Sequence, residues 1–401
     1  MSDSGLTDRT AEEAELRATI RAFCADHDPA TTPRDQFLSD RFDAGLAAVH
    51  YPVGHGGLGL PRSLQQAAEG QFARAGAPVP AAGRNVIGLG MAAPTLIAFG
   101  TDAQLDRWLK PLWLAEEIWC QLFSEPGAGS DLANLSTRAV RDGDDWVVSG
   151  QKVWTSLAHH ARWALLLART DPDAPKHAGL TYFVLDMHAP GVEVRPLRQL
   201  TGEAEFNEVF ITDARVPDAS RLGEVGAGWR VANATLMNER VAIGGGTAPR
   251  EGGLIGFAAR AWREHPEART PELHQRLLTL WARAEVARLA AERMRQQLAS
   301  GQPGPDGSAV KLTFALLNQE ISGFEIELAA AGGLTYDDWT MRRAGSSDYS
   351  RGPAYRYLRS KGNSIEGGTS EILRNIIAER VLGLPPEPRT DTGVPWKDLP
   401  R

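Results

Sequence analysis

The chain has 401 residues, a mass of 43.4 kDa and a formal net charge of −7, from 43 basic and 50 acidic side chains. Lys and Arg never occur five in a row, which argues against a nucleic-acid-binding protein, since phosphate neutralisation supplies most of that affinity. The hydrophobic share of 42% is enough for a large buried core and excludes a globally disordered chain.

Nothing in the sequence indicates export or membrane insertion. No apolar stretch approaches the ~20 residues that a membrane-spanning helix needs. The N-terminal residues are acidic and contain no apolar segment followed by a cleavage site. Cys24 and Cys120 are too few for a disulfide framework or a four-cysteine zinc site. We therefore expect a cytoplasmic protein without a bound metal and, from its size, an enzyme.

The spacing of apolar residues predicts a helical domain over residues 1–117 and a β domain over 118–226. Leu16, Ile20 and Phe23 recur at the spacing of one helix face. After residue 118, short runs rich in β-branched and aromatic residues alternate with Gly, Pro and Asp. Several short strands at near-regular spacing indicate a compact sheet domain, either a barrel or a sandwich.

The pattern is helical again over residues 227–384. An apolar seam that repeats about every 3.5 residues indicates a helix packed in a bundle. This seam comprises Val310, Phe314, Leu317, Ile321, Phe324 and Leu328. The proline-rich residues 385–401 are predicted to form a tail. The predicted fold class is thus α+β and multidomain.

Two of the four motifs with candidate chemistry lie at the start of the β domain. In the first, Ser124 to Asp131, glycines and hydroxyls would let backbone amides approach a phosphate or a ring. In the second, Gly150 to Ser156, Trp154 stands beside hydroxyls and could form the wall of a flat aromatic cofactor site. Taken singly, a tight turn and a core tryptophan explain these two stretches better.

The other two motifs lie in the second helical region. Glu239 and Arg240 are neighbours in a predicted helix, where adjacent side chains diverge by about 100° and cannot both face one pocket. Ser364 to Ile372 contains two glycines before Thr369, which with Ser370 is a candidate N-cap for the following helix. Taken singly, a solvated charge pair and an ordinary helix entry explain them better.

In this order, and around a helical–sheet–helical chain, the four motifs resemble those of the acyl-CoA dehydrogenase family. The resemblance covers about residues 10–385. Its most specific stretches are Ser124 to Asp131, Phe206 to Pro217 and Gly368 to Arg380. It implies the acyl-CoA dehydrogenase fold, with an N-terminal helical domain, a central β domain and a C-terminal four-helix bundle, and it implies bound FAD.

Position by position, the resemblance implies where the cofactor and the substrate bind. The residues implied to contact FAD are Phe123, Ser124, Gly129, Ser130, Trp154, Ser156, Thr369 and Glu371. Ser130 is also implied to lie near the pantetheine arm of the substrate, and Arg240 near its CoA portion. Glu366 or Gly367 is implied to supply a backbone amide for the thioester oxygen.

The reaction that the resemblance implies is α,β-desaturation of an acyl-CoA thioester. A carboxylate removes a proton from the carbon next to the thioester carbonyl, and a hydride passes from the β-carbon to flavin N5. Because this carbon acid is weak, the site must stabilise the developing enolate by hydrogen bonds and raise the pKa of the base by desolvation. The implied electron acceptor is electron transfer flavoprotein.

Two carboxylates are candidates for the base. Many family members place it directly before the Gly-Thr of the fourth motif, where this chain has Gly367 and where Glu366 comes one residue earlier. One residue displaces a carboxylate by about 3.5 Å, enough to lose contact with the α-carbon. Other members use a glutamate before the arginine of the helix after the β domain, and Glu239 matches that position. We predict Glu239, with Glu366 as the alternative.

Two elements that family members donate across a subunit interface differ here. The Arg-x-x-Phe-Gly stretch is absent. Phe257 is the only Phe between residues 241 and 313, and the residue after it is Ala258 instead of Gly. The glycine-rich FAD contact is altered at Ala330 to Tyr336. The chain therefore resembles members that form heteromers of two unlike dehydrogenase chains, and we expect a homo- or hetero-oligomer. Two other functions stay open: a partner subunit with little activity alone, and a flavin oxidase or monooxygenase.

Overall fold

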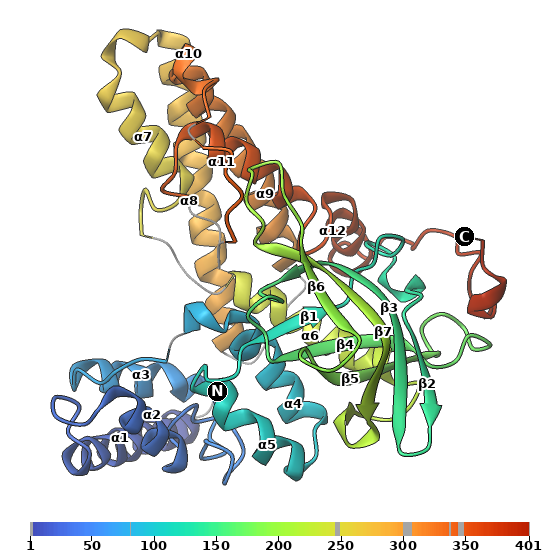
Figure 1. Cartoon of the computed structure of the whole chain (residues 1–401). Coiled ribbons are helices and arrows are strands. Elements are labelled where there is room, and N and C mark those ends of the chain that lie inside the picture. The colour runs from blue at the N-terminus through green and yellow to red at the C-terminus, as the bar shows by residue number, and fades with distance from the viewer. Residues whose placement is uncertain are drawn as a thin grey trace.

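The computed structural model describes residues 3–80, 82–244, 249–299, 307–336, 338–343 and 349–400. It confirms the predicted α+β class, with a helical region, a sheet region and a second helical region in chain order (Figure 1). The first region contains α1 (Asp3–Asp26), α2 (Arg34–Asp43), α3 (Gln65–Arg74), α4 (Ala93–Phe99) and α5 (Asp102–Trp113). The predicted apolar face of α1 is buried at Leu16, Ile20 and Phe23.

The central region is one mixed sheet, of eight strands within the described residues. They are β1 (Trp119–Leu122), β2 (Arg138–Asp142), β3 (Asp145–Ser156), β4 (Trp163–Arg169), β5 (Leu180–Asp186), β6 (Val192–Pro196), β7 (Phe206–Pro217) and β8 (Arg221–Leu222). Their order is β6-β7-β3-β2-β4-β5-β8, and β1 pairs in parallel with β4. The long antiparallel pair β3–β7 contains two register shifts, one of them between Lys152 and Thr155.

Both faces of the sheet are buried at the central strands β4 and β5, which explains their near-continuous apolar runs. On β4, Leu165 and Leu167 pack in a core shared with the helices. Leu166, between them, packs in a separate core enclosed by the sheet itself, together with Phe183 of β5. A sheet that encloses its own core is the barrel or sandwich that the sequence predicts.

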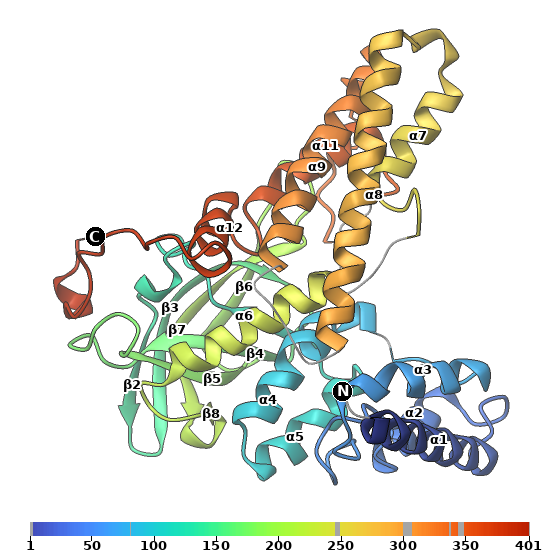
Figure 2. The same ribbon diagram turned by 180° about the vertical axis from the view of Figure 1, so that it is seen from behind.

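The second helical region begins with α6 (Gly228–Gly244), which packs across β4 and β5 (Figure 2). The others are α7 (Leu254–Glu264), α8 (Pro271–Ala299), α9 (Gly307–Leu328), α10 (Ala330–Gly333), α11 (Pro353–Ser360) and α12 (Ser370–Ile376). The bundle of α7, α8, α9 and α11 projects away from the sheet (Figures 1 and 2). The predicted seam of α9 is buried at Ile321, Phe324 and Leu328, whereas Phe314 is exposed.

The last described residues return to the sheet, although the sequence suggests a tail there. The backbone N–H groups of Trp396 and Lys397 donate hydrogen bonds of 3.0 Å to the carbonyls of Ala174 and Pro172. Pro395 and Pro175 form a β-bridge beside them. The domain boundaries that the sequence suggests stay a prediction. No helix in the described ranges is both long and apolar enough to cross a membrane.

Candidate functional site

The first two sequence motifs meet at the start of the sheet. The backbone N–H of Val153 donates a hydrogen bond of 2.9 Å to the carbonyl of Ser124. Glu125 and Ala128 exchange two backbone hydrogen bonds of 3.0 and 3.1 Å, so the glycine-rich loop, residues 124–131, begins with a tight turn. The two stretches are distant in sequence and adjacent in space.

A buried ion pair between Lys152 and Glu125 holds this junction in place. The ammonium of Lys152 donates hydrogen bonds of 3.0 Å to the carbonyl of Phe123 and 2.9 Å to the carboxylate of Glu125. That carboxylate also accepts the N–H of Ser136 at 2.7 Å and the N–H of Thr137 at 2.9 Å. Burial alone would raise the pKa of Glu125, but these partners outweigh it and lower that pKa to about 2. Glu125 is therefore a fixed anion.

The outer side of the glycine-rich loop is open. A Cβ built at Gly127 or Gly129 would meet nothing within 4 Å, and neither residue has a positive φ. Neither backbone conformation nor packing within the described chain thus requires glycine at these two positions. Close approach by a group from outside the chain is the remaining physical reason for glycine here. Ser130, the next residue after Gly129, is exposed.

Trp154 stands at the edge of the same loop. It lies within the register shift of β3 between Lys152 and Thr155, has a φ of +61° and is 58% exposed. Its ring meets the ring of Phe206 edge to face, with centroids 6.0 Å apart. A strained, non-glycine backbone that presents an exposed tryptophan is typical of a binding site. Beside it, the buried hydroxyl of Thr155 has no hydrogen-bond partner among the described residues, while Ser156 is half-buried.

The fourth motif is a strained turn that leads into α12. Gly367 and Gly368 have φ values of +61° and +97°, which favour glycine. Thr369 is the N-cap, because its hydroxyl accepts the N–H of Ile372 at 3.2 Å. The ammonium of Lys311 on α9 donates a hydrogen bond of 2.7 Å to the carbonyl of Gly368 and so fixes the turn. Glu371, one residue into the helix, is exposed.

Glu366 is held in an ion pair inside this motif. The guanidinium of Arg359 contacts both carboxylate oxygens, at 3.1 and 2.9 Å, and the amide of Asn363 donates a third hydrogen bond at 2.7 Å. Arg359 also lies 3.4 Å from Glu205. Burial works against the charge of Arg359, but these carboxylates outweigh it and raise its pKa. The backbone N–H of Glu366 already donates to the carbonyl of Gly362 at 2.9 Å.

The start of β7 and the loop before it join the second motif to the fourth. Asn207 donates a hydrogen bond of 3.0 Å to the carbonyl of Thr155, and Glu205, two residues earlier, pairs with Arg359. The structure thereby brings the first, second and fourth motifs into one set of contacts. Asn207, Arg359 and Lys311 are absent from the sequence-based site. Arg359 and Lys311 lie outside every motif, whereas Asn207 lies in the specific stretch Phe206 to Pro217, which could have identified it.

The third motif lies on α6, and the side chains of Glu239 and Arg240 fall outside the described part of the structure. One turn earlier on α6, the structure shows a contact with the sheet. The hydroxyl of Thr235 lies 3.0 Å from the hydroxyl of Tyr182 on β5, whose ring meets that of Phe123 edge to face.

A cavity of about 370 Å³ opens between α7, α8 and α9. Its walls are mainly apolar and include Leu254, Trp281, Met294, Val310, Phe314 and Ile321. Gly367 of the fourth motif and Lys311 also line it. The cavity therefore adjoins the turn that the sequence assigns to substrate and cofactor binding.

Comparisons with known proteins assign these features to one family. The Acyl-CoA dehydrogenase N-terminal, middle and C-terminal domains match residues 10–116, 120–214 and 226–382. Acyl-CoA dehydrogenase FadE34 of Mycobacterium tuberculosis is 41% identical over 94% of this chain, which spans 49% of that protein. Acyl-CoA dehydrogenase IpdE1 of the same organism is 40% identical, with 86% of each chain covered.

Solved structures agree with this assignment. The ChsE4–ChsE5 complex from Mycobacterium tuberculosis contains a chain that is 28% identical, with 94% of this chain and 98% of that chain covered and a TM-score of 0.66. A variant of the Tcur3481–Tcur3483 steroid ACAD is 27% identical, with 94% and 100% covered and a TM-score of 0.68. This chain belongs to the acyl-CoA dehydrogenase family.

Proposed function

We propose that this chain is an FAD-dependent oxidoreductase that acts on CH–CH bonds and desaturates an acyl-CoA thioester between its α- and β-carbons. The observation that carries the proposal is the junction of Ser124 and Val153, where an open glycine-rich loop lies beside the exposed and strained Trp154. The cytoplasmic location expected from the sequence stays a prediction.

The donor set of this junction fits a flavin. Backbone amides and hydroxyls of Ser124, Gly129 and Ser130 suit a pyrophosphate and the polar edge of a ring. Trp154 offers an aromatic wall, and the half-buried Ser156 offers a polar contact. The resemblance adds Phe123, Thr369 and Glu371 to the residues that would hold FAD. The bound flavin would supply a hydride acceptor for the β-carbon of the substrate.

Glu239 is the proposed base. It would take the proton from the α-carbon of the thioester, as the family resemblance implies. Glu366 is a weaker candidate because Arg359 and Asn363 already occupy its carboxylate with three hydrogen bonds. For the developing charge on the thioester oxygen we propose the amide of Gly367, since the amide of Glu366 already donates to Gly362. Arg240 is proposed to bind the CoA portion.

The proposed substrate carries a bulky, ring-bearing acyl group. A cavity of about 370 Å³ with mainly apolar walls adjoins Gly367, so the acyl end has room beyond the reacting carbons. The similar Tcur3481–Tcur3483 protein is a steroid ACAD by its description, which is consistent with this acyl class. Electron transfer flavoprotein is the proposed acceptor, by the family resemblance.

We further propose that the chain works in a hetero-oligomer with a related dehydrogenase chain. Phe257 stands alone in the region where relatives carry Arg-x-x-Phe-Gly, and its ring lies 4.3 Å from the guanidinium carbon of Arg356 within this chain. A residue packed in its own bundle is a poor donor to a neighbour's cofactor. The similar ChsE4–ChsE5 structure is a complex of two named chains. One FAD per chain in protein purified alone would count against the need for a partner.

The test of the proposed reaction is anaerobic mixing. The chain loaded with FAD is mixed with CoA thioesters that range from a straight short chain to a ring-bearing side chain. The visible absorbance of the oxidised flavin is expected to bleach, most completely with the ring-bearing thioester. A flavin that stays oxidised with every thioester, in the chain alone and with its partner, would contradict the proposal.

A further inference from the structure

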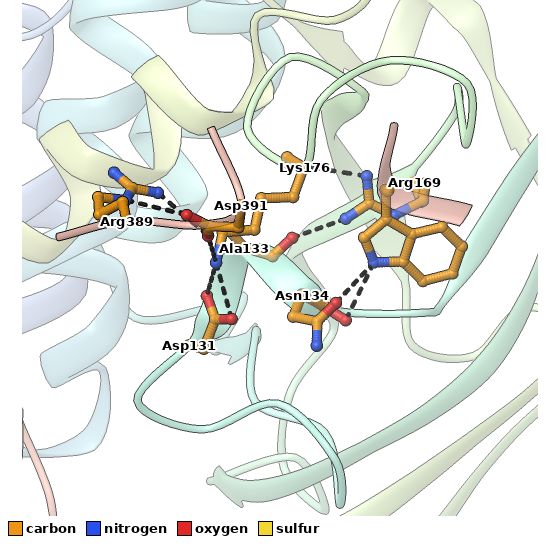
Figure 3. A network of polar contacts seen from close by, with 8 residues as sticks. Asp131, Ala133, Asn134, Arg169, Lys176, Arg389 and Asp391 are labelled. Atoms are coloured by element: carbon orange, nitrogen blue, oxygen red, sulfur yellow. Dashed lines mark hydrogen bonds and ion pairs between the residues drawn. The ribbon is translucent and has the colours of Figure 1, made fainter. Parts of the chain in front are cut away.

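The C-terminal residues 389–399, which we call the strap, lie beside the far end of the glycine-rich loop and are joined to it through Lys176 (Figure 3). Family matching ends at residue 382, so the strap lies outside the matched domains. Its backbone is joined to the β4–β5 connection by hydrogen bonds of 3.0 Å from Trp396 to Ala174 and from Lys397 to Pro172. The strap therefore has a defined place on the sheet, although it is far in sequence from every residue it contacts.

One contact is a chain of charges that ends on the loop. The ammonium of Lys176 donates hydrogen bonds of 2.9 and 2.8 Å to the two carboxylate oxygens of Asp131. The same ammonium lies 2.6 Å from the carboxylate of Asp391, which also accepts from Arg389 at 3.1 and 3.2 Å. These donors hold the pKa of Asp391 well below its usual range, so the carboxylate is charged at neutral pH.

A second contact holds the residues that follow the loop. The indole N–H of Trp396 donates a hydrogen bond of 2.8 Å to the side-chain oxygen of Asn134. The guanidinium of Arg169 lies 4.2 Å from the centre of the Trp396 ring and donates hydrogen bonds of 2.6 Å to the carbonyl of Ala133 and 3.1 Å to the carbonyl of Leu135. Trp396 thus covers the arginine that fixes residues 133–135.

The two ends of the glycine-rich loop are consequently held in different ways. The first end is fixed from within the sheet, through Glu125 and the buried Lys152. The second end is fixed at the surface, through Asp131 and Asn134, by groups that the strap supplies or covers. A loop held at both ends loses less conformational entropy when a ligand binds to its middle, where Gly129 and Ser130 lie.

We infer that the strap positions the glycine-rich loop for its ligand, with Asp391 and Trp396 as positioning residues. The inference rests on the proposed function, because the ligand of Gly129 and Ser130 is the FAD pyrophosphate. It adds a part of the chain that the family domains do not include. Loss of the strap contacts leaves the sheet intact and makes residues 126–135 more mobile, which weakens FAD binding.

The test uses the full-length chain with the double substitution Asp391→Asn and Trp396→Ala. Lys397→Ala is the matched control, because Lys397 lies on the same strap and its ammonium pairs with the surface carboxylate of Asp173, away from the loop. Amide hydrogen exchange is measured without flavin, and FAD affinity is measured by titration. Trp396→Phe keeps the aromatic face over Arg169 and is expected to restore part of the effect.

In the double variant, exchange at residues 126–135 is expected to rise while exchange at residues 164–168 of β4 stays unchanged. The Kd for FAD is expected to rise about tenfold, with the Lys397→Ala control at the wild-type value. Unchanged exchange at residues 126–135, or faster exchange with unchanged FAD affinity, would overturn the inference. A wild-type chain that binds no FAD would instead contradict the proposed function, while the exchange result would still decide whether the strap holds the loop.

Discussion

The guanidinium of Arg359 donates hydrogen bonds of 3.1 and 2.9 Å to the two carboxylate oxygens of Glu366. Both oxygens of this carboxylate are thereby occupied by a donor within the chain, which makes Glu366 the weaker candidate for the base. We propose that Glu366 supports the turn at Gly367 and Gly368, and that Glu239 is the base.

The buried pair Glu125–Lys152 gives a prediction about stability. Glu125→Gln leaves the ammonium of Lys152 without its charged partner, and we expect a loss of about 3–5 kcal/mol in the free energy of unfolding. Chemical denaturation followed by circular dichroism measures it. Glu193→Gln, which breaks an exposed pair with Arg195 on the same sheet, is the control and is expected to change nothing measurable. An equal loss of unfolding free energy in both variants would contradict the prediction that the buried pair stabilises the fold more than the exposed pair does.

Because Trp154 is exposed, we predict that its substitution weakens FAD binding without lowering the stability of the fold. Trp154→Ala removes a side chain that is mostly in solvent, so the melting temperature is expected to stay close to that of the wild type. The Kd for FAD is expected to rise about tenfold, because an aromatic wall is lost. Trp339→Ala removes another exposed tryptophan and serves as the control. Wild-type FAD affinity in Trp154→Ala would remove Trp154 from the site.

His159 predicts a pH dependence of stability. Burial, the neighbouring His160 and Arg343 lower its pKa from 6.5 to about 4 in the folded chain. Between these values the unfolded chain binds a proton that the folded chain does not, so the free energy of unfolding falls as the pH falls from 6.5 toward 4. His159→Gln is expected to flatten the dependence of the free energy of unfolding on pH. Substitution of the exposed His188 is expected to leave this dependence unchanged. The measurement is urea denaturation at several pH values in that window.

The cavity between α7, α8 and α9 predicts acyl selectivity. Phe314→Trp adds volume to its wall and is expected to reduce kcat/KM for a ring-bearing thioester by about tenfold, while a short straight-chain thioester is affected little. Leu278→Trp, at an exposed position of α8 outside the cavity lining, is the control. An equal loss for both thioesters would place the acyl group elsewhere.

Much of the fold was predictable because it depends on local periodicity. The helix face of Leu16, Ile20 and Phe23 and the apolar runs of β4 and β5 correspond to buried elements of the structure. The seam of α9 was predicted for its whole length, but its first half lines a cavity, as the exposed Phe314 shows. Periodicity identifies an apolar face and does not identify what covers it.

The contacts that define the site depend on pairs of residues far apart in sequence, and no local pattern contains them. Asp391 and Lys176 are separated by more than half the chain, and both look like ordinary surface charges in the sequence. Arg359 likewise gives no sign that it pairs with Glu366 and Glu205. The family resemblance implies which residues contact the cofactor, and this stays a prediction, but it could not show that the carboxylate of Glu366 is engaged by Arg359.

The most direct test of the account compares two substitutions, Glu239→Gln and Glu366→Gln, in the chain loaded with FAD and supplied with the best thioester substrate. The measured quantity is the rate at which the flavin absorbance bleaches on rapid anaerobic mixing. Glu239→Gln is expected to slow this rate by a factor of about 10² to 10⁴, and Glu366→Gln by less than about tenfold. A Glu239→Gln variant that bleaches at the wild-type rate would contradict the assignment of Glu239 as the base.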